Sequence, residues 1–317
     1  MSEKVKKLED ISGVGPATAQ KLRTGGYYTI ESVAVAAARE LASASGLSTE
    51  KAAEISIAAR EMLNIRFQTA EELLAQRKNV IRLTTGSKAL DDLLGGGVES
   101  QAILELIGEF GSGKTQICHT LCATVQLPIE QKGAGGGAIY IDTEGTFRPE
   151  RLAQIAEAKG LKREDVLKNV TVARAFNSDH QILIAEKLDD LIPEKNTKLV
   201  IVDSVISHFR AEYLGRESLP ERQQHLNNHL HRLLRTSEIY NIPVVVTNQV
   251  VAAPDVFFGP TIRPAGGHII AHLSTNRVFL RKSKKELRIA RIIDSPYLAE
   301  AECIFSINEH GIEDAQE

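Results

Sequence analysis

The segment GEFGSGKT, residues 108–115, has the residue types and spacing of a loop that binds phosphate groups. It fits the pattern G-x-x-x-x-G-K-[ST], follows the apolar run AILELI and precedes the helical pattern KTQICHTLCATVQ. In such a loop the glycines let the backbone point its N–H groups inward, and the start of the helix adds partial positive charge. We therefore expect Lys114 to reach the β- and γ-phosphates of ATP and Thr115 to bind Mg²⁺.

Polar side chains that follow three other apolar runs complete a possible site for hydrolysis. LVIVD ends in Asp203, at the end of a predicted strand where an α/β sheet places ligand-facing groups, so Asp203 suits the outer shell of Mg²⁺. Asp142 and Glu144 both follow AIYI, and either one is able to orient or deprotonate the attacking water. Gln249, after VVVTN, senses the γ-phosphate or is a buried polar cap.

Short apolar runs rich in β-branched residues alternate with helix-length segments after residue 80. The first four runs are apolar almost throughout, as strands buried on both faces of a parallel sheet must be. We therefore predict an α/β domain over residues 80–317, with a mostly parallel, twisted sheet covered by helices. The predicted strands are 102–108, 138–142, 199–203, 244–248, 277–282 and 288–294.

Residues 1–62 show short helical periods separated by glycine, which predicts a small all-α domain. Within it, ISGVGPATAQKL resembles a helix-hairpin-helix motif, with Gly13 and Gly15 in the turn. Such a turn exposes backbone amides to a DNA phosphate, and the alternative is a packing or protein contact. Residues 63–79 combine a brief extended stretch with a charged helix, and we interpret them as a linker.

The composition gives no sign of a nucleic-acid partner. Hydrophobic residues at 43% and charged residues at 25% are ordinary for a globular protein. No apolar run approaches the roughly 18 residues of a transmembrane helix, and the charged N-terminus MSEKVKKLED does not fit a signal peptide, so we expect a cytoplasmic protein without a membrane partner. With a net charge of −3, binding to DNA must depend on local basic clusters and backbone amides.

Cysteine and histidine spacing does not predict a further metal site. Cys118, Cys122 and Cys303 lack the CxxC spacing of a zinc site, and free thiols are expected, the first two facing the core. His225 and His229 are four residues apart, but the glutamate of H-E-x-x-H and an evident third ligand are missing.

Six segments together resemble the archaeal RadA recombinases, a RecA-like strand-exchange family, in their order and spacing. The resemblance covers nearly the whole chain and implies a RecA-like P-loop ATPase core preceded by a small all-α helix-hairpin-helix domain. The segments are GEFGSGKTQ (108–116), YIDTEGTFRPER (140–151), VDSVISHFRAEY (202–213), TNQVVA (247–252), GGHIIAH (266–272) and IIDSP (292–296). The implied ATP-binding residues in the first segment are Gly108, Glu109, Phe110, Gly111, Ser112, Gly113, Lys114, Thr115 and Gln116.

The resemblance also implies roles for single side chains at the site. Glu144, in preference to Asp142, is the implied catalytic glutamate, and it acts with Lys114 and Gln249. Arg151 would stack against adenine. His268, together with Gln249, would link the γ-phosphate to the DNA-binding segments.

In the family that this chain resembles, ATP lies between neighbouring subunits. The resemblance implies that Asp294 of one subunit acts in trans, near the γ-phosphate and a monovalent cation bound by the next subunit. This chain has Ala299 in the stretch where the family carries a proline, which is a departure from the usual cap over adenine.

Two segments are predicted to bind DNA. Residues 206–224 have little apolar periodicity, which predicts a loop, and on chemistry alone a solvated loop is as good an interpretation as a DNA contact. The resemblance makes this the first DNA-binding loop, and it makes residues 251–268, with a shorter spacing at Gly259 and Pro260, the second. The predicted contacts are Arg210, Tyr213, Arg216 and Arg222 in the first and Arg263 in the second.

Phe67-Gln68-Thr69-Ala70 matches the F-x-T-A polymerisation motif of the same family. In that motif the phenylalanine and the alanine fill pockets on the next subunit, and the extended stretch suits addition to a sheet edge. The contact predicts open, head-to-tail assembly.

The resemblance implies a DNA-dependent ATPase that forms filaments or rings, binds single-stranded DNA and exchanges strands with homologous duplex DNA. ATP and Mg²⁺ are the implied cofactors, and accessory recombination proteins are implied partners. The alternatives are a recombinase-paralogue mediator, a hexameric RecA-like DNA motor or regulatory ATPase, and a structural DNA-coating protein.

Overall fold

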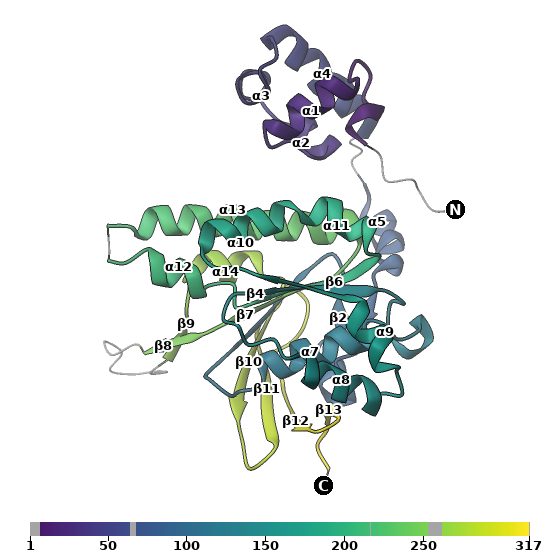
Figure 1. Ribbon diagram of the computed structural model, residues 1–317, viewed down its shortest axis with the longest axis vertical. Helices are drawn as coiled ribbons and strands as arrows, with labels where there is room; N and C mark the ends of the chain where they lie inside the picture. The colour runs from purple at the N-terminus through teal and green to yellow at the C-terminus, as the bar shows by residue number, and fades with distance from the viewer. Residues whose placement is uncertain (1–6, 64–67, 216, 253–261, 317) are drawn as a thin grey trace. The chain divides into compact units, whose positions relative to one another are not determined.

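The computed structural model describes residues 7–63, 68–215, 217–252 and 262–316. The chain forms two compact units, residues 1–78 and residues 79–317 (Figure 1).

The first unit is helical. Pro16 begins helix α1 directly after Gly15, at a position where its missing N–H is no loss, and Gly46, with φ of 64°, ends α3. Apolar side chains from α1 to α4, including Leu22, Leu41 and Ile55, form one core. The elements are η1 (Leu8–Asp10), α1 (Pro16–Thr24), α2 (Ile30–Val35), α3 (Ala38–Ser45), α4 (Thr49–Leu63), α5 (Ala70–Gln76) and η2 (Arg77–Asn79).

The second unit is built on a nine-stranded sheet with the order β13-β12-β11-β10-β3-β7-β6-β4-β5. The six strands from β10 to β5 in this order run parallel, and β11, β12 and β13 are antiparallel additions. The prediction of a mostly parallel sheet is confirmed. The strands are β3 (Ile103–Gly108), β4 (Gly137–Asp142), β5 (Val170–Arg174), β6 (Thr197–Asp203), β7 (Val244–Asn248), β10 (Asn276–Lys282), β11 (Leu287–Asp294), β12 (Glu302–Asn308) and β13 (Gly311–Asp314).

Two short antiparallel pairs accompany the large sheet. β1 (Arg82–Leu83) pairs with β2 (Val98–Glu99). β8 (Val250–Ala252) pairs with β9 (Ile262–Pro264), and these strands lie at the two ends of the predicted second DNA-binding segment. Phe257, Phe258, Gly259 and Pro260 lie outside the described residues.

Helices cover both faces of the large sheet, which explains why its central strands are apolar throughout (Figure 1). Leu104 and Leu106 pack into one hydrophobic cluster, and Ile103, which points the other way, packs into a second. The first cluster includes residues of α6 (Lys88–Leu93), α7 (Lys114–Thr124), α8 (Pro149–Ala158) and α9 (Arg163–Lys168). The second includes residues of α10 (Ser178–Glu186), α11 (Leu188–Glu194), α12 (Ser207–Glu212), α13 (Leu219–Tyr240) and α14 (His268–Leu273).

The prediction of a loop over residues 206–224 is wrong for most of that range. α12 occupies its first part, and α13 begins at Leu219. α12 buries only Phe209, so it shows no apolar periodicity. Its last residue, Glu212, instead accepts hydrogen bonds from the backbone N and the Oγ of Ser178, at the start of α10.

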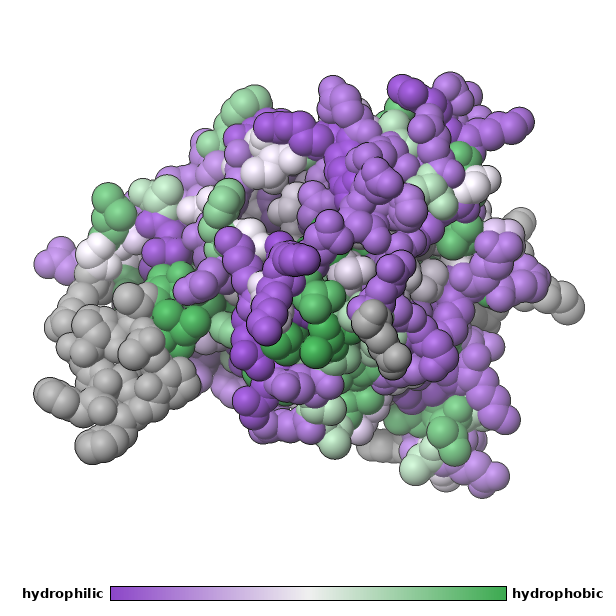
Figure 2. All heavy atoms as spheres, turned by 90° about the horizontal axis from the view of Figure 1, so that it is seen from below, coloured by the Kyte–Doolittle hydropathy of each residue, from purple (hydrophilic) through white to green (hydrophobic). Residues whose placement is uncertain are grey.

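The face of the molecule in Figure 2 is largely hydrophilic. Hydrophobic side chains on this face gather in a few separate groups. Within the described ranges, no helix is long and apolar enough to cross a membrane.

The interior holds one histidine that the sequence singled out. His229 of α13 is buried, and its Nε2 lies 3.1 Å from the Nε2 of Gln181. Burial lowers the pKa of His229 to about 4. Its ring packs in the second hydrophobic cluster beside Phe209, and no group of three or more possible metal ligands occurs among the described residues. Cys118 and Cys122 are buried behind the phosphate loop, as predicted.

His229 predicts a loss of stability in mild acid. The unfolded chain takes up a proton as the pH falls through 6.5, whereas the folded chain resists protonation until about pH 4, so stability present above pH 6.5 is lost across this window. The contribution is about 3 kcal/mol at most. Urea unfolding of the wild type and of His229→Leu at pH 7 and pH 4.5 measures it. The variant should lose less stability between the two pH values, and an equal loss in both proteins contradicts the assignment.

Candidate active site

The phosphate loop joins β3 to α7, and its glycines stand where other residues do not fit. Gly113 has φ of 109° directly before the first residue of α7. A Cβ atom on Gly108 would lie 2.4 Å from the carbonyl oxygen of Leu280 on the neighbouring strand β10. The loop is therefore wrapped closely against the sheet, with the N-terminus of α7 facing outward.

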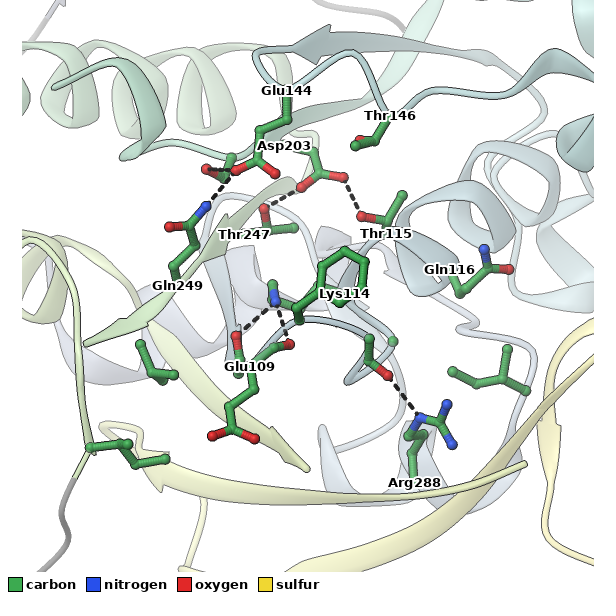
Figure 3. Close-up of a pocket in the computed structure, with 18 of the residues that line it drawn as sticks. Glu109, Lys114, Thr115, Gln116, Glu144, Thr146, Asp203, Thr247, Gln249 and Arg288 are labelled. Carbon is green, nitrogen blue, oxygen red and sulfur yellow. Dashed lines mark hydrogen bonds between the residues drawn. The ribbon is translucent and has the colours of Figure 1, made fainter. Parts of the chain in front are cut away.

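This loop forms one wall of a pocket of about 860 Å³ (Figure 3). Eight of the predicted ATP-binding residues line it, whereas Ser112 is buried behind the loop and neither Arg151 nor Asp294 contributes to the lining. The other walls come from the ends of β4, β6 and β7 and from β8, β9, β11 and β12. The lining residues are Gly108, Glu109, Phe110, Gly111, Gly113, Lys114, Thr115, Gln116, Glu144, Thr146, Asp203, Ser204, Thr247, Gln249, Val250, Val251, Ile262, Arg288 and Ile307.

Lys114 is folded back onto its own loop. Its Nζ donates to the carbonyl oxygens of Gly108, at 2.7 Å, and Glu109, at 3.0 Å. Burial lowers the pKa of Lys114, and the carboxylates of Asp203 and Glu144 oppose that shift. Charged phosphate oxygens are stronger acceptors than these two carbonyls, so the ammonium group is placed to exchange them for a bound triphosphate.

Asp203 holds the pocket floor together through its two carboxylate oxygens. Oδ2 accepts hydrogen bonds from Thr115 Oγ1 at 2.8 Å and from Tyr140 OH at 2.6 Å, and Oδ1 accepts one from Thr247 Oγ1. A hydroxyl and a carboxylate are oxygen ligands of the kind that Mg²⁺ prefers. Among the described residues there is no cluster of three metal-ligating side chains, which fits an ion that takes its remaining ligands from phosphates and water.

The structure separates Asp142 from Glu144, which the sequence pattern alone leaves as alternatives. Asp142 is buried, and its carboxylate accepts the four backbone N–H groups of residues 144–147 and pairs with Arg174 at 3.2 Å. Its oxygens are therefore occupied in shaping the turn after β4. Glu144, unlike Asp142, is exposed and lines the pocket, so its carboxylate is accessible to a water molecule there.

A short chain of hydrogen bonds leads from Glu144 to α12, and Figure 3 shows its part between Glu144 and Gln249. Glu144 Oε1 accepts from Ser204 Oγ at 2.9 Å and from Gln249 Nε2 at 2.6 Å. Gln249 Oε1 in turn accepts from Arg210 Nη1 at 3.2 Å. The amide of Gln249 thus connects a predicted DNA-binding arginine with the pocket carboxylate.

Arg151 lies at the edge of the pocket on α8. Its Nε donates to Gln116 Oε1 at 2.8 Å, and its two Nη atoms donate to the carbonyl oxygens of Asn308 and Glu309. The guanidinium group is thereby held flat beside Gln116, which lines the pocket.

Several residues in or beside the pocket carry roles that the sequence reasoning missed. Ser204, Tyr140, Thr247 and Arg174 all bond to one of the acidic side chains at the site. The available signal was a hydroxyl residue at or near the end of an apolar strand, as in VVVTN and AIYID. Arg174 gave no such signal, because it ends a strand in which partly buried and exposed residues alternate after Val170.

The other predicted DNA-binding residues are spread over several elements. Arg210 and Tyr213 lie in and after α12, and the ring of Tyr213 lies 5.8 Å from that of His225. Arg222 lies in the first turns of α13, Arg263 is exposed on β9, and His268 is exposed at the start of α14. Arg216 lies outside the described residues.

In the first unit, Gly13 is exposed with φ of 83° and Gly15 precedes α1, so the backbone of this turn faces solvent. Ala70 is exposed at the start of α5, which Thr69 caps by accepting a hydrogen bond from Glu72 N. Phe67 lies outside the described residues.

Asp294 lies far from the pocket of its own subunit for a topological reason. β10 is parallel to β3, and its residue Arg277 pairs with Glu105, near the start of β3, whereas Leu280 pairs with Gly108. Asp294, the last residue of antiparallel β11, pairs with Arg277. It therefore lies near the beginning of the parallel strands, whereas the phosphate loop follows the end of β3.

Comparison with known proteins agrees with these features. The Rad51 family model matches residues 76–315, and a model described as a SAM-like helix-hairpin-helix tandem matches residues 5–61. The "DNA repair and recombination protein RadA" of Aeropyrum pernix is 52% identical over 312 residues, which cover 98% of each chain. The protein of the same name from Metallosphaera sedula is 52% identical over 316 residues, 99% of this chain and 98% of its own. With a RecA-like P-loop core, a helix-hairpin-helix domain and this similarity, the chain belongs to the Rad51 family, as a RadA-type DNA repair and recombination protein.

Proposed function

We propose that this protein is an ATP-dependent recombinase that forms filaments on single-stranded DNA and exchanges strands with homologous duplex DNA. The observation that carries the proposal is the hydrogen-bonded chain from Arg210 through Gln249 to Glu144. It joins a basic side chain on a predicted DNA-binding segment to the carboxylate that faces the phosphate pocket. A contact with DNA at α12 would therefore alter the group that positions the attacking water.

The pocket residues divide the work of phosphoryl transfer to water among them. The loop amides and Lys114 would bind the phosphates, and Glu144 would orient the water and accept its proton. Thr115 and Asp203 would hold Mg²⁺, which supplies charge neutralisation at the β- and γ-phosphates when bound. Gln249 would report the γ-phosphate to the DNA-binding segments, and Arg151 would support the adenine end of the pocket.

Head-to-tail assembly would use the two ends of the parallel strands. The phosphate loop lies at one end and Asp294 at the other, so a neighbour that offers its Asp294 to this pocket would make a heterologous contact, which repeats as an open filament or closes into a ring. In this arrangement Asp294 and a monovalent cation would act near the γ-phosphate in trans.

Of the two edge strands of the large sheet in the described part of the core, β5 suits the F-x-T-A motif with Phe67 and Ala70. β5 is an edge strand with Val172 41% exposed, and Leu183 of the following helix is 52% exposed. The other edge strand, β13, is covered, because Asp314 accepts hydrogen bonds from Ser87 Oγ and Ala89 N of the α6 segment. We therefore assign the extended part of the motif to β5 of the next subunit.

Glu144 and Asp142 give opposite expectations on mutation. Glu144→Gln should keep ATP binding and thermal stability, because it leaves the turn intact, while hydrolysis falls by about 100-fold or more. Asp142→Ala should lower the stability by about 2–4 kcal/mol, since it leaves backbone N–H groups without an acceptor. ATP hydrolysis and thermal melting distinguish them. Wild-type hydrolysis by Glu144→Gln would show that Glu144 is not the base.

Strand exchange itself is tested with a single-stranded oligonucleotide and homologous duplex DNA in the presence of ATP and Mg²⁺. The wild type should form homology-dependent joint molecules, and Lys114→Ala should form none because it loses phosphate contacts. Lys88→Ala, which removes an exposed lysine of α6, is the matched control and should behave as wild type. Robust ATP hydrolysis on DNA without joint molecules would instead favour the mediator or motor functions.

Action of Asp294 in trans predicts complementation between two inactive variants. Glu144→Gln subunits keep Asp294, and Asp294→Ala subunits keep Glu144, so a mixed filament contains interfaces with both intact groups. Random mixing in equal amounts should restore hydrolysis to about a quarter of the wild-type rate. If Asp294 serves its own pocket, the mixture stays as inactive as the separate variants.

A further inference from the structure

A buried ion pair lies within the sheet, beyond the surface of the pocket. Glu105 of β3 is completely buried, and its Oε2 accepts a hydrogen bond from Arg277 Nε of β10 at 2.6 Å. The Arg277 side chain is only 12% exposed. A buried ion pair is often no more stabilising than apolar side chains of the same volume. Stability therefore does not by itself account for charged residues at these two positions.

The second carboxylate oxygen of Glu105 holds an asparagine. Asn248 Nδ2 donates to Glu105 Oε1 at 2.6 Å and to the carbonyl oxygen of Ala265 at 2.8 Å. Both partners are acceptors only, so they fix which end of the amide faces them. The other end, Oδ1, is buried and has no hydrogen-bond partner among the described residues. Asn248 is thus held from one side, by the ion pair and by the Ala265 backbone.

Ala265 and Asn248 connect this network to the β8–β9 pair on one side and to Gln249 on the other. Ala265 directly follows β9, on the return side of the predicted second DNA-binding segment, and its N–H donates to the carbonyl oxygen of Gln249 at 2.8 Å. Asn248 directly precedes Gln249, whose side chain bonds to Glu144. A shift of the β8–β9 pair therefore reaches Asn248 through Ala265 and reaches Gln249 through the backbone.

We propose that Asn248 is a positioning residue that couples the second DNA-binding segment to ATP hydrolysis, and that the Glu105–Arg277 pair is present to orient its amide. The inference rests on the proposed function, because it gives these residues a part in DNA-dependent hydrolysis. None of the three side chains lines the nucleotide pocket. They act through Gln249.

The test compares hydrolysis with and without single-stranded DNA for the wild type and Asn248→Ala. The ratio of the two rates should fall about tenfold in the variant, as expected when a catalytic group loses its positioning. ATP binding should stay within about twofold of wild type. Gln126→Ala is the matched control, because Gln126 Nε2 also donates to two carbonyl oxygens but lies far from this network, and it should keep the wild-type ratio.

The double variant Glu105→Met/Arg277→Met separates positioning from stability. The double variant should fold, because no unpaired charge remains, and its melting temperature should fall only by the cost of the one acceptor that Asn248 Nδ2 loses. The DNA-dependent ratio should fall as in Asn248→Ala. A folded double variant with wild-type stimulation by DNA would overturn the role of the ion pair.

Hydrogen exchange gives a readout that does not depend on catalysis. The Ala265 amide should exchange faster in Asn248→Ala than in the wild type or in Gln126→Ala. If the wild type shows no stimulation by DNA, the proposed function fails, and the exchange rates still decide whether Asn248 anchors this segment. Unchanged exchange at Ala265 would overturn the inference whatever the hydrolysis data show.

Discussion

The buried carboxylate of Asp203 is the point on which the geometry of the pocket depends. Hydroxyl groups from α7, β4 and β7 donate to it, so it joins the phosphate-loop helix to the sheet. A carboxylate this deeply buried is tolerated only when such donors surround it. Because Thr115 is the second residue of α7, the position of the loop relative to the strands follows from these bonds. The same hydrogen bonds fix the Asp203 carboxylate beside Thr115, so that both oxygen-bearing side chains lie where a cation would bind.

The direction of each strand then determines at which end of the sheet its last residue lies, and therefore whether that residue is close to the pocket of its own subunit. The parallel strands all end on one side of the sheet, where Glu144, Ser204 and Gln249 line the pocket together with the phosphate loop. β11 runs in the opposite direction, so its last residue, Asp294, lies on the side where the parallel strands begin. A single subunit therefore has the pocket at one end of the strands and the Asp294 carboxylate, which does not line that pocket, at the other end. Under the proposed function, assembly of subunits would bring these two ends together.

The sequence predicted the elements that depend on local pattern. Apolar strands, the glycine loop and the polar residues that end each strand gave the sheet and most of the pocket lining. Asp142 and Glu144 were not separable from the residues alone, because their difference lies in the turn whose backbone N–H groups donate to Asp142 and in Arg174, a partner 32 positions along the chain. Tyr140 and Thr247 looked like core residues of apolar strands. α12 was missed because its anchor is the contact between Glu212 and Ser178, which no local periodicity reveals.

The net charge of −3 also counts groups that the fold has already paired. Glu105 pairs with Arg277 and Asp142 with Arg174, so each of these pairs is neutral as a whole, whereas Glu212 accepts from neutral groups of Ser178 and keeps its full negative charge. Arg210 also keeps its full charge, because the hydrogen-bond partner of its side chain among the described residues is the neutral oxygen of Gln249, at 3.2 Å. A phosphate is a charged acceptor, so a bound DNA phosphate would replace the Gln249 amide oxygen as the hydrogen-bond acceptor of Arg210. Gln249 would then keep its shorter bond to Glu144 but lose the arginine on its other side. Under the proposed function, DNA and Gln249 would thus compete for the guanidinium group of Arg210. The outcome of this competition would alter the hydrogen bonding of Gln249 beside Glu144 without a large movement of the fold.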